Sequence, residues 1–348
     1  MEARWARRRL DFKFLAVTSR EKLRQKDTYY IKVSDPSMPS VYGIGEAGLF
    51  RGLSCDDRPG YEEKLDEVCR DIDRYRDDLE LLSDWPSLRM GLETAFLDLK
   101  NGGRRIPFES AWTRGKGEIP INGLVWMGDK TLMAKRVEEK LEQGFKCVKL
   151  KIGGINFDEE LSLLATLRDV APDITVRLDA NGAFTPENAL ERLNRLAQFE
   201  IHSIEQPIRQ GQWEAMARIC RESPIKIALD EELIGLNAIE PQRDMLERIR
   251  PQFIILKPTL VGGFAASDRW IGLAEEHGVG WWATSALESN IGLNAIAQWV
   301  ATKHVTMYQG LGTGQLYTNN IPSPLTLRGE ELSYNPLESW KIPDLDWH

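Results

Sequence analysis

Six ionisable residues in the middle of the chain lie at or near the ends of short apolar runs. In chain order they are Lys149, Lys151, Asp179, Glu205, Asp230 and Lys257. A strand that is buried on both faces of a parallel sheet is normally almost entirely apolar, because a charged group loses its hydration there. These six residues are therefore expected to pair with one another or to hold a metal ion.

The three acids of this set suit a hard divalent cation. Mg²⁺ prefers carboxylate oxygens and keeps some of its coordination positions for water or substrate. We therefore expect Asp179, Glu205 and Asp230 to bind Mg²⁺. Mn²⁺ is the alternative, because the choice between these ions depends on their supply as much as on the site.

The lysines on either side of the acids predict proton transfer next to a carboxylate. A proton on the neighbouring carbon is too weakly acidic to be removed unaided, and a bound divalent cation stabilises the enediolate that results. Lys149 and Lys151 point the same way on a strand, and a nearby like charge and a cation both favour the neutral amine that a base requires. Lys257 provides a second possible proton carrier. Glu231, next to Asp230, is expected to face the opposite side of its strand and to play a supporting role.

The elements that must position these residues repeat at a steady interval. Eight apolar runs are each followed by a polar residue, and from 151 onward their ends lie 25 to 28 residues apart. Helical patterns separate most of them, so the segment reads as βα units, and eight such units most economically close into a (β/α) TIM-type barrel. The predicted strands are 119–124, 146–151, 174–179, 201–205, 226–230, 253–257, 280–285 and 304–310. The predicted helices are 130–143, 157–170, 212–221, 236–248, 264–277 and 290–302.

The first part of the chain has a different pattern. Alternating runs predict a small antiparallel sheet, and two helical patterns follow it, which together indicate a separate α+β domain. The predicted strands are 10–18, 28–34 and 41–47, and the predicted helices are 61–82 and 87–101. We place this domain at 1–113, the barrel at 114–320, and a proline-rich C-terminal segment that returns over the first domain at 321–348.

Composition narrows the class of partner. The 348 residues carry a net charge of −8 with both signs interspersed, which argues against a nucleic-acid surface. No run approaches the roughly 20 apolar residues that a membrane-spanning helix requires. The four cysteines show no C-x-x-C spacing and predict neither a zinc site nor a disulfide framework. We expect a cytoplasmic protein that acts on a small molecule, and no oligomeric state is predicted.

Taken in order, the strand-end motifs resemble those of the enolase superfamily, specifically its muconate-lactonising subgroup. The motifs are KLK at 149–151, LDANG at 178–182, IEQP at 204–207, ALDE at 228–231 and LKP at 256–258. The resemblance spans nearly the whole chain. It implies that the N-terminal α+β domain caps the barrel and that Asn181 and Glu231 support the metal-binding residues.

Two further segments resemble the o-succinylbenzoate synthases, which are dehydratases of menaquinone biosynthesis. These segments are SALESNIG at 285–292 and GLGTG at 310–314. The resemblance implies that Lys151 removes the α-proton and returns it to the departing hydroxyl, with Lys257 stabilising the enediolate from the opposite face and Lys149 beside the base. It also implies that the barrel binds a small carboxylate and its succinyl arm through Ser285, Leu287, Gly310, Gly312 and Thr313. Capping-loop residues near Gly48 and Arg51 are expected to close the mouth.

Several other functions stay open. Dipeptide epimerases share the metal and lysine motifs, but they usually carry D-x-D where this chain has Gly310-Leu311-Gly312. An N-succinylamino acid racemase would use the same carboxylate and succinyl arm, with a lysine on each face. A barrel enzyme that forms a Schiff base through Lys151 or Lys257, and a barrel that only binds ligands, are the alternatives outside this superfamily.

Overall fold

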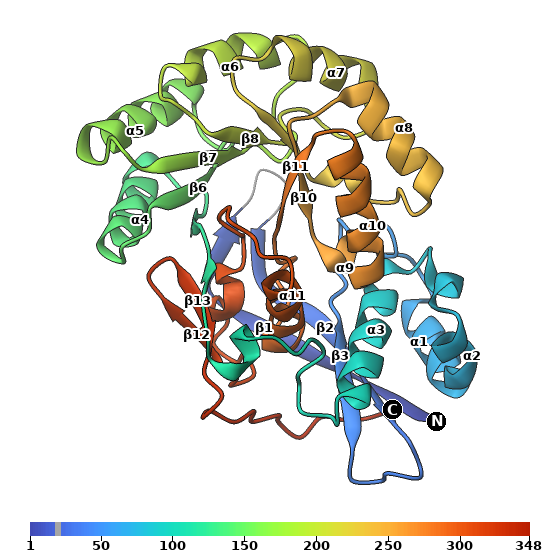
Figure 1. Ribbon diagram of the computed structural model, residues 1–348. Helices are drawn as coiled ribbons and strands as arrows, with labels where there is room; N and C mark the ends of the chain where they lie inside the picture. The colour runs from blue at the N-terminus through green and yellow to red at the C-terminus, as the bar shows by residue number, and fades with distance from the viewer. Residues whose placement is uncertain (18–21) are drawn as a thin grey trace.

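A curled parallel sheet of seven strands forms the centre of the computed structural model, which describes residues 1–17 and 22–348. The strands are hydrogen-bonded in chain order, so that their carboxyl ends lie at one edge (Figure 1). They are β5 (Gly123–Val125), β6 (Cys147–Lys151), β7 (Thr175–Asp179), β8 (Ser203–Glu205), β9 (Ile227–Leu229), β10 (Phe253–Leu256) and β11 (Gly280–Ala283). The modified barrel predicted from the sequence is confirmed.

Helices cover the outside of this sheet, and α4 to α8 form an arc around β6 to β9 in Figure 1. Their starts follow local sequence signals. The Asn156 side chain accepts a hydrogen bond from the Asp158 amide at 2.9 Å. Acidic residues fill the first turn of α5, where their negative charge interacts favourably with the helix dipole. The helices are α4 (Lys130–Glu142), α5 (Phe157–Val170), α6 (Ala189–Ala197), α7 (Trp213–Glu222), α8 (Ile239–Ile249), α9 (Pro258–Val261), α10 (Gly263–Glu276) and α11 (Asn290–Ala301).

The eighth predicted strand, 304–310, is the main departure from the sequence prediction. Two isolated parallel bridges, Ile121 with Gln309 and Thr284 with Gly310, close the sheet in its place. The predicted strand 119–124 is divided, because β4 (Ile119–Pro120) pairs antiparallel with β13 (Glu331–Tyr334). Only the end of the segment 304–310, at Gln309 and Gly310, pairs with neighbouring strands. This pairing places Gly310 at the mouth of the barrel.

The N-terminal part is an antiparallel sheet with helices packed on it. The sheet has the order β1 (Glu2–Val17), β2 (Lys22–Ser34), β3 (Tyr42–Ala47), and its first two strands begin well before the predicted ones. Thr18, the last residue of predicted strand 10–18, lies outside the described residues. The predicted helix 61–82 is broken at Asp71 into α1 (Tyr61–Arg70) and α2 (Ile72–Asp77), followed by the 3-10 turn η1 (Leu79–Leu82).

Helix α3 (Pro86–Lys100) joins this sheet to the barrel, because it packs on β3 and also against α9 and α10. Its contact with β3 is so close that a Cβ atom on Gly45 would lie 1.9 Å from the Gly91 carbonyl oxygen. Only glycine permits this approach of two backbones.

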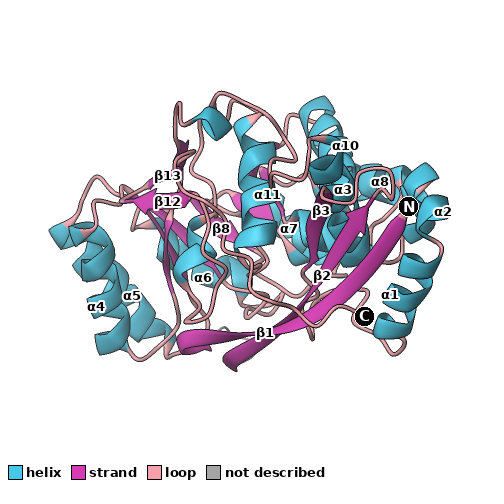
Figure 2. Ribbon diagram, turned by 90° about the horizontal axis from the view of Figure 1, so that it is seen from below, coloured by secondary structure: helices cyan, strands magenta, loops and turns pink. Residues whose placement is uncertain are grey.

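The C-terminal segment returns to the N-terminal sheet. After β12 (Leu325–Arg328) and β13, the side chains of Trp340, Ile342, Leu345 and Trp347 pack around Tyr30 and Ile44. The two chain ends lie near each other in both views (Figure 2). The boundaries 1–113, 114–320 and 321–348 remain a prediction. Among the described residues, no helix is both long and apolar enough to cross a bilayer.

We expect Glu46 to be a principal link between the two parts of the fold. Its buried carboxylate on β3 accepts hydrogen bonds from the Ser289 amide at 2.8 Å, the Ser289 hydroxyl at 2.6 Å and the Gly292 amide at 2.8 Å. Glu46→Ala leaves these donors at the start of α11 without an acceptor and should lower the free energy of unfolding by about 2 to 4 kcal/mol. Urea titration checks this, and a loss no larger than that of the exposed control Glu63→Ala would contradict it.

Candidate functional site

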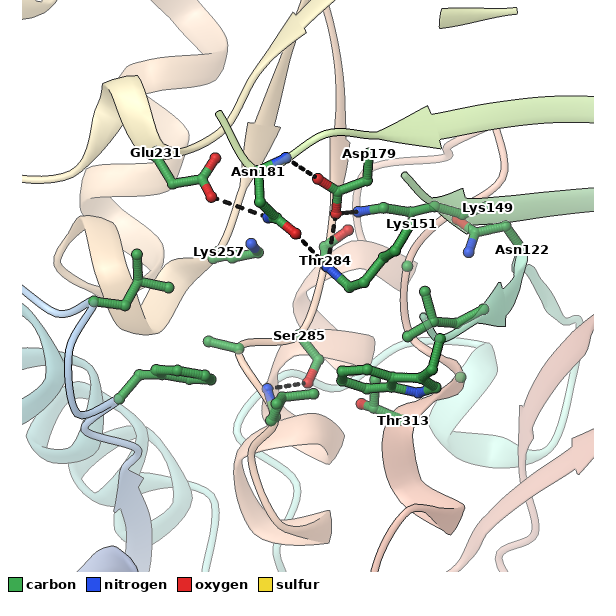
Figure 3. Close-up of a pocket in the computed structure, with 18 of the residues that line it drawn as sticks. Asn122, Lys149, Lys151, Asp179, Asn181, Glu231, Lys257, Thr284, Ser285 and Thr313 are labelled. Carbon is green, nitrogen blue, oxygen red and sulfur yellow. Dashed lines mark hydrogen bonds and ion pairs between the residues drawn. The ribbon is translucent and has the colours of Figure 1, made fainter. Parts of the chain in front are cut away.

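A cavity of about 270 Å³ opens at the carboxyl ends of the parallel strands (Figure 3). Strand ends, the segment that closes the barrel and a loop of the N-terminal part all contribute to it. Its lining residues are Phe50, Gly52, Leu53, Asn122, Leu124, Trp126, Lys149, Lys151, Asp179, Asn181, Glu231, Lys257, Thr284, Ser285, Ala286, Leu287, Gly310, Gly312 and Thr313. Most of the residues expected to carry chemistry therefore meet in one place.

Two lysines of β6 converge on one carboxylate of β7. Strand pairing sets Lys151 beside Asp179, and both ammonium groups reach the same oxygen, Asp179 Oδ2, with Lys149 Nζ at 3.0 Å and Lys151 Nζ at 2.9 Å. Burial opposes ionisation, but Lys149 and Lys151 hold the pKa of Asp179 well below its usual range. The expected alignment of the two lysines on one side of the strand is therefore observed.

Asn181 connects Lys151 of β6 to Glu231. Its backbone is left-handed, with a φ of 43°, a conformation that asparagine tolerates better than most residues. This turn brings its amide oxygen to 2.8 Å from Lys151 Nζ and its amide nitrogen to 3.0 Å from Glu231 Oε1. Figure 3 shows Asn181 between Lys151 and Glu231.

The prediction that Glu231 faces away from the site is wrong. Strand β9 ends at Leu229, and the backbone of Asp230 leaves the extended conformation before a 3-10 turn begins at Glu231. The alternation of side chains along a strand therefore no longer applies, and Glu231 lines the cavity.

Glu205 and Asp230 lie behind the cavity surface and are covered by lysines. Each is only 2% exposed. Lys149 binds Glu205, and Lys257 binds Asp230. Burial and the neighbouring carboxylate of Asp179 raise the pKa of Glu205 to about 8. The site thus disfavours a negative charge on Glu205 unless a further cation accompanies it.

These residues fit a divalent cation by their chemistry. Within residues 1–17 and 22–348, no three metal-binding side chains are already gathered as a cluster. However, the three acids end or follow adjacent strands, all are buried, and Glu205 Oε1 has no hydrogen-bond partner. A buried oxygen without a partner costs free energy that a cation would recover. In this arrangement the lysine ammonium groups bind the carboxylates, and a divalent cation would share those carboxylates with the lysines.

The opposite wall of the cavity is neutral. Ser285, Leu287, Gly310, Gly312 and Thr313 line it, as the sequence resemblance implied. The Ser285 hydroxyl donates to Glu288 at 2.7 Å and accepts from the Leu287 amide at 2.9 Å, which fixes the loop after β11. The ionisable lining residues all come from the ends of β6, β7, β9 and β10.

The capping loop around Gly48 and Arg51 contributes to the cavity, although neither of these two residues lines it. Arg51 turns to Asp57, with 2.6 Å between Nη1 and Oδ1, and Gly48 packs beside Glu288 and Thr259. Their neighbours line the cavity instead: Phe50, Gly52 and Leu53. No periodic signal marks which side chains of an irregular loop point inward, so the individual residues could not be chosen from the sequence.

Sequence reasoning also missed Asn122, Leu124 and Trp126. Asn122 and Leu124 lie within the divided first strand of the barrel and Trp126 follows it, and the apolar pattern there carries no charge that would draw attention to it. His202 and His277 do not line the cavity. His202 stacks on Phe253 instead, with 5.4 Å between ring centroids.

Comparison with known proteins places this arrangement in a family. A family model described as "Enolase C-terminal domain-like" matches residues 132–333. The chain belongs to the enolase superfamily. The resemblance read from its strand-end motifs is thereby confirmed.

Two relatives narrow the position within the enolase superfamily. An o-succinylbenzoate synthase of Desulfotalea psychrophila is 48% identical over 94% of this chain and 98% of its own length. The crystal structure of MenC from Desulfotalea psychrophila LSv54 superposes with a TM-score of 0.84 at 46% identity, covering 96% of this chain and 99% of that one. The chain therefore belongs to the o-succinylbenzoate synthase family.

A third relative has another activity. An N-succinylamino acid racemase of Thermus thermophilus is 33% identical over 60% of this chain and 54% of its own length. This match covers little more than half of that protein, so it supports the shared superfamily more than a shared activity.

We expect the turn at Asn181 to separate a backbone effect from a side-chain effect. Asn181→Gly and Asn181→Ala both remove the contacts to Lys151 and Glu231, but only alanine keeps the strain of positive φ. The free energy of unfolding of the alanine variant should therefore be about 1 kcal/mol lower than that of the glycine variant. Urea denaturation of the two variants checks this, and equal stabilities would show that the turn relaxes.

Proposed function

We propose that this protein is an o-succinylbenzoate synthase, a hydro-lyase that dehydrates 2-succinyl-6-hydroxy-2,4-cyclohexadiene-1-carboxylate to 2-succinylbenzoate in menaquinone biosynthesis. The relative of the same name, 48% identical over almost the entire chain, is the observation that carries this proposal. The arrangement of lysines and acids around one cavity supports it.

Lys151 is the base in this proposal. It takes the proton from the carbon next to the ring carboxylate and returns it to the departing hydroxyl, so that water leaves and the ring becomes aromatic. Asp179 and Asn181 orient its ammonium group through hydrogen bonds of 2.9 and 2.8 Å. A general base must be held within hydrogen-bonding reach of the proton that it removes.

Lys257 serves as the charged partner on the other side of the ring. It follows β10, which three strands separate from β6, the strand that carries Lys151. Burial opposes ionisation, but the carboxylates of Asp230 and Glu205 hold the pKa of Lys257 above its ordinary value. A lysine kept as an ammonium ion stabilises a developing anion, and it is a poor nucleophile for a Schiff base.

Asp179, Glu205 and Asp230 are the proposed ligands of Mg²⁺, or of Mn²⁺ in its place. The ion supplies electrostatic stabilisation of the enediolate. Lys149, in contact with Asp179 and Glu205, balances the charge of two of these acids. Asn181 and Glu231 support the set.

The neutral wall is the proposed place of the succinyl arm, near Ser285, Leu287, Gly310, Gly312 and Thr313. No acid lies at 310–313 to bind an ammonium group, which disfavours a dipeptide substrate. Racemisation of an N-succinylamino acid is the second candidate, since the Thermus thermophilus relative carries that name and two lysines approach the cavity from different strands. We also propose a cytoplasmic location, which the four free cysteines favour.

The dehydration is tested by turnover. With Mg²⁺ the purified protein should rapidly consume the cyclohexadiene substrate, whose absorbance is lost as it reacts. EDTA should abolish this loss, and Lys151→Ala should lower kcat by about 10³-fold or more. Failure of the intact, metal-binding protein to react would remove the dehydratase proposal. Exchange of the α-proton of N-succinylamino acids would then favour the racemase.

The metal site is tested without turnover. Mg²⁺ binds the folded protein only, so at about 100 times its Kd it should add about 2.7 kcal/mol to stability and raise Tm by several degrees. Glu205→Gln should largely abolish the rise. Glu160→Gln is the matched control, because Glu160 is also 2% exposed but is bonded to the Gly153 amide away from the three acids. Equal responses of the two variants would exclude Glu205 as a ligand.

A further inference from the structure

Trp126 lies against the proposed base, although nothing in its sequence context marks it as functional. Its indole lines the cavity, and Lys151 Nζ lies 5.8 Å from the ring centroid. That distance is within the range in which an ammonium group is attracted to the face of an aromatic ring. The side chain is only 4% exposed, so its position is fixed by packing.

The hydrogen bonds of Lys151 leave its ammonium group free to move in one direction, and the indole limits that movement. An ammonium group has three donors, and two of them meet Asp179 Oδ2 and Asn181 Oδ1. Lysine carries its charge on a flexible four-carbon stem, so hydrogen bonds on one side alone do not fix where the nitrogen lies. The ring of Trp126 is a wall that limits its movement.

An arm of the N-terminal sheet holds Trp126 in place. We call residues 10–17 and 22–25 of β1 and β2 the β1–β2 arm. The pairing of β1 with β2 shifts register between Asp11 and Ala16, and there β1 contacts the barrel instead, with Lys13 N donating to Leu316 O at 2.9 Å. The arm residues Leu10, Phe12 and Ala16 form one apolar cluster with Trp126, Leu287 and Tyr317.

Phe14 of the arm makes the direct contact. Its ring meets Trp126 edge to face, with 6.0 Å between centroids. Arg136 of α4 lies over the Phe14 ring and donates to the Trp126 carbonyl at 2.8 Å. Both the ring and the backbone of Trp126 are therefore held by neighbours that do not touch the cavity.

We propose that Trp126 is a positioning residue for Lys151 and that the β1–β2 arm holds it, so that the N-terminal part helps to set the proton-transfer geometry. This inference rests on the proposed role of Lys151 as the base. Misplacing a proton-transfer group by about 1 Å costs up to about 10²-fold in rate. The effect is expected in kcat, because the indole acts on the base.

Kinetics of matched variants of the metal-loaded enzyme test the proposal. Trp126→Leu should lower kcat by about 10-fold or more with KM changed by less than about 3-fold, and Trp126→Phe should recover most of the loss. With α-deuterated substrate, the isotope effect on kcat should rise in Trp126→Leu. Trp112→Leu is the control, because Trp112 is also 4% exposed but bonds to Leu332 O away from the cavity.

A second pair of variants tests the arm. Phe14→Leu should lower kcat in the same direction but by less than Trp126→Leu. Phe157→Leu is its control, because Phe157 is also half-buried, meets Phe184 edge to face at 6.2 Å and has Arg192 over its ring. A kcat for Trp126→Leu equal to that of Trp112→Leu, or a change in KM alone, would overturn the proposal.

A measurement without turnover separates this inference from the proposed reaction. In protein labelled with 5-fluorotryptophan, the ¹⁹F resonance that disappears in Trp126→Phe belongs to Trp126. Lys151→Met should shift that resonance, and Lys100→Met, at an exposed lysine of α3, should not. If the wild type fails to dehydrate the substrate, the proposed function fails while this shift still reports the contact. Absence of the shift overturns the inference.

Discussion

The structure depends on the compensation of charge at the carboxyl ends of buried strands. Asp179, Glu205 and Asp230 are almost completely removed from water, and each meets an ammonium group of Lys149, Lys151 or Lys257. Burial of a charge is tolerated only when an opposite charge or a metal ion accompanies it. The acids and lysines therefore constrain one another, and the positions of the six side chains on five strands depend on one another.

That constraint divides the cavity into two halves. The ionisable half is built on consecutive strands whose ends lie together because the sheet is parallel. The neutral half is built on Ser285, Leu287 and the closing segment around Gly310, where the barrel is completed by isolated bridges. In an enolase-superfamily chain this division suits a substrate with one reacting carboxylate and one arm. The ionisable half is held by the ends of regular strands, while the neutral half is formed by loops.

The N-terminal part contributes more than a cover. Its loop supplies Phe50, Gly52 and Leu53 to the cavity, and its carboxylate Glu46 binds the start of α11. The β1–β2 arm reaches the barrel through Phe14 and Trp126, next to the proposed base. The N-terminal part thus contacts the cavity, the neighbour of the proposed base and the start of α11.

The sequence by itself determined the barrel, the order of its strands and the six charged residues at or near their ends. Those features are periodic or local: a strand-end residue in a parallel sheet must lie at the common edge, whatever packs around it. The predicted helix 157–170 coincides with α5 for the same reason. Only the tertiary structure decided the rest. Glu231 entered the cavity because β9 ends early, and the run 304–310 pairs with the sheet only through isolated bridges at Gln309 and Gly310. Phe50 and Trp126 reached the site through contacts between segments that are distant in the chain, which no local pattern encodes.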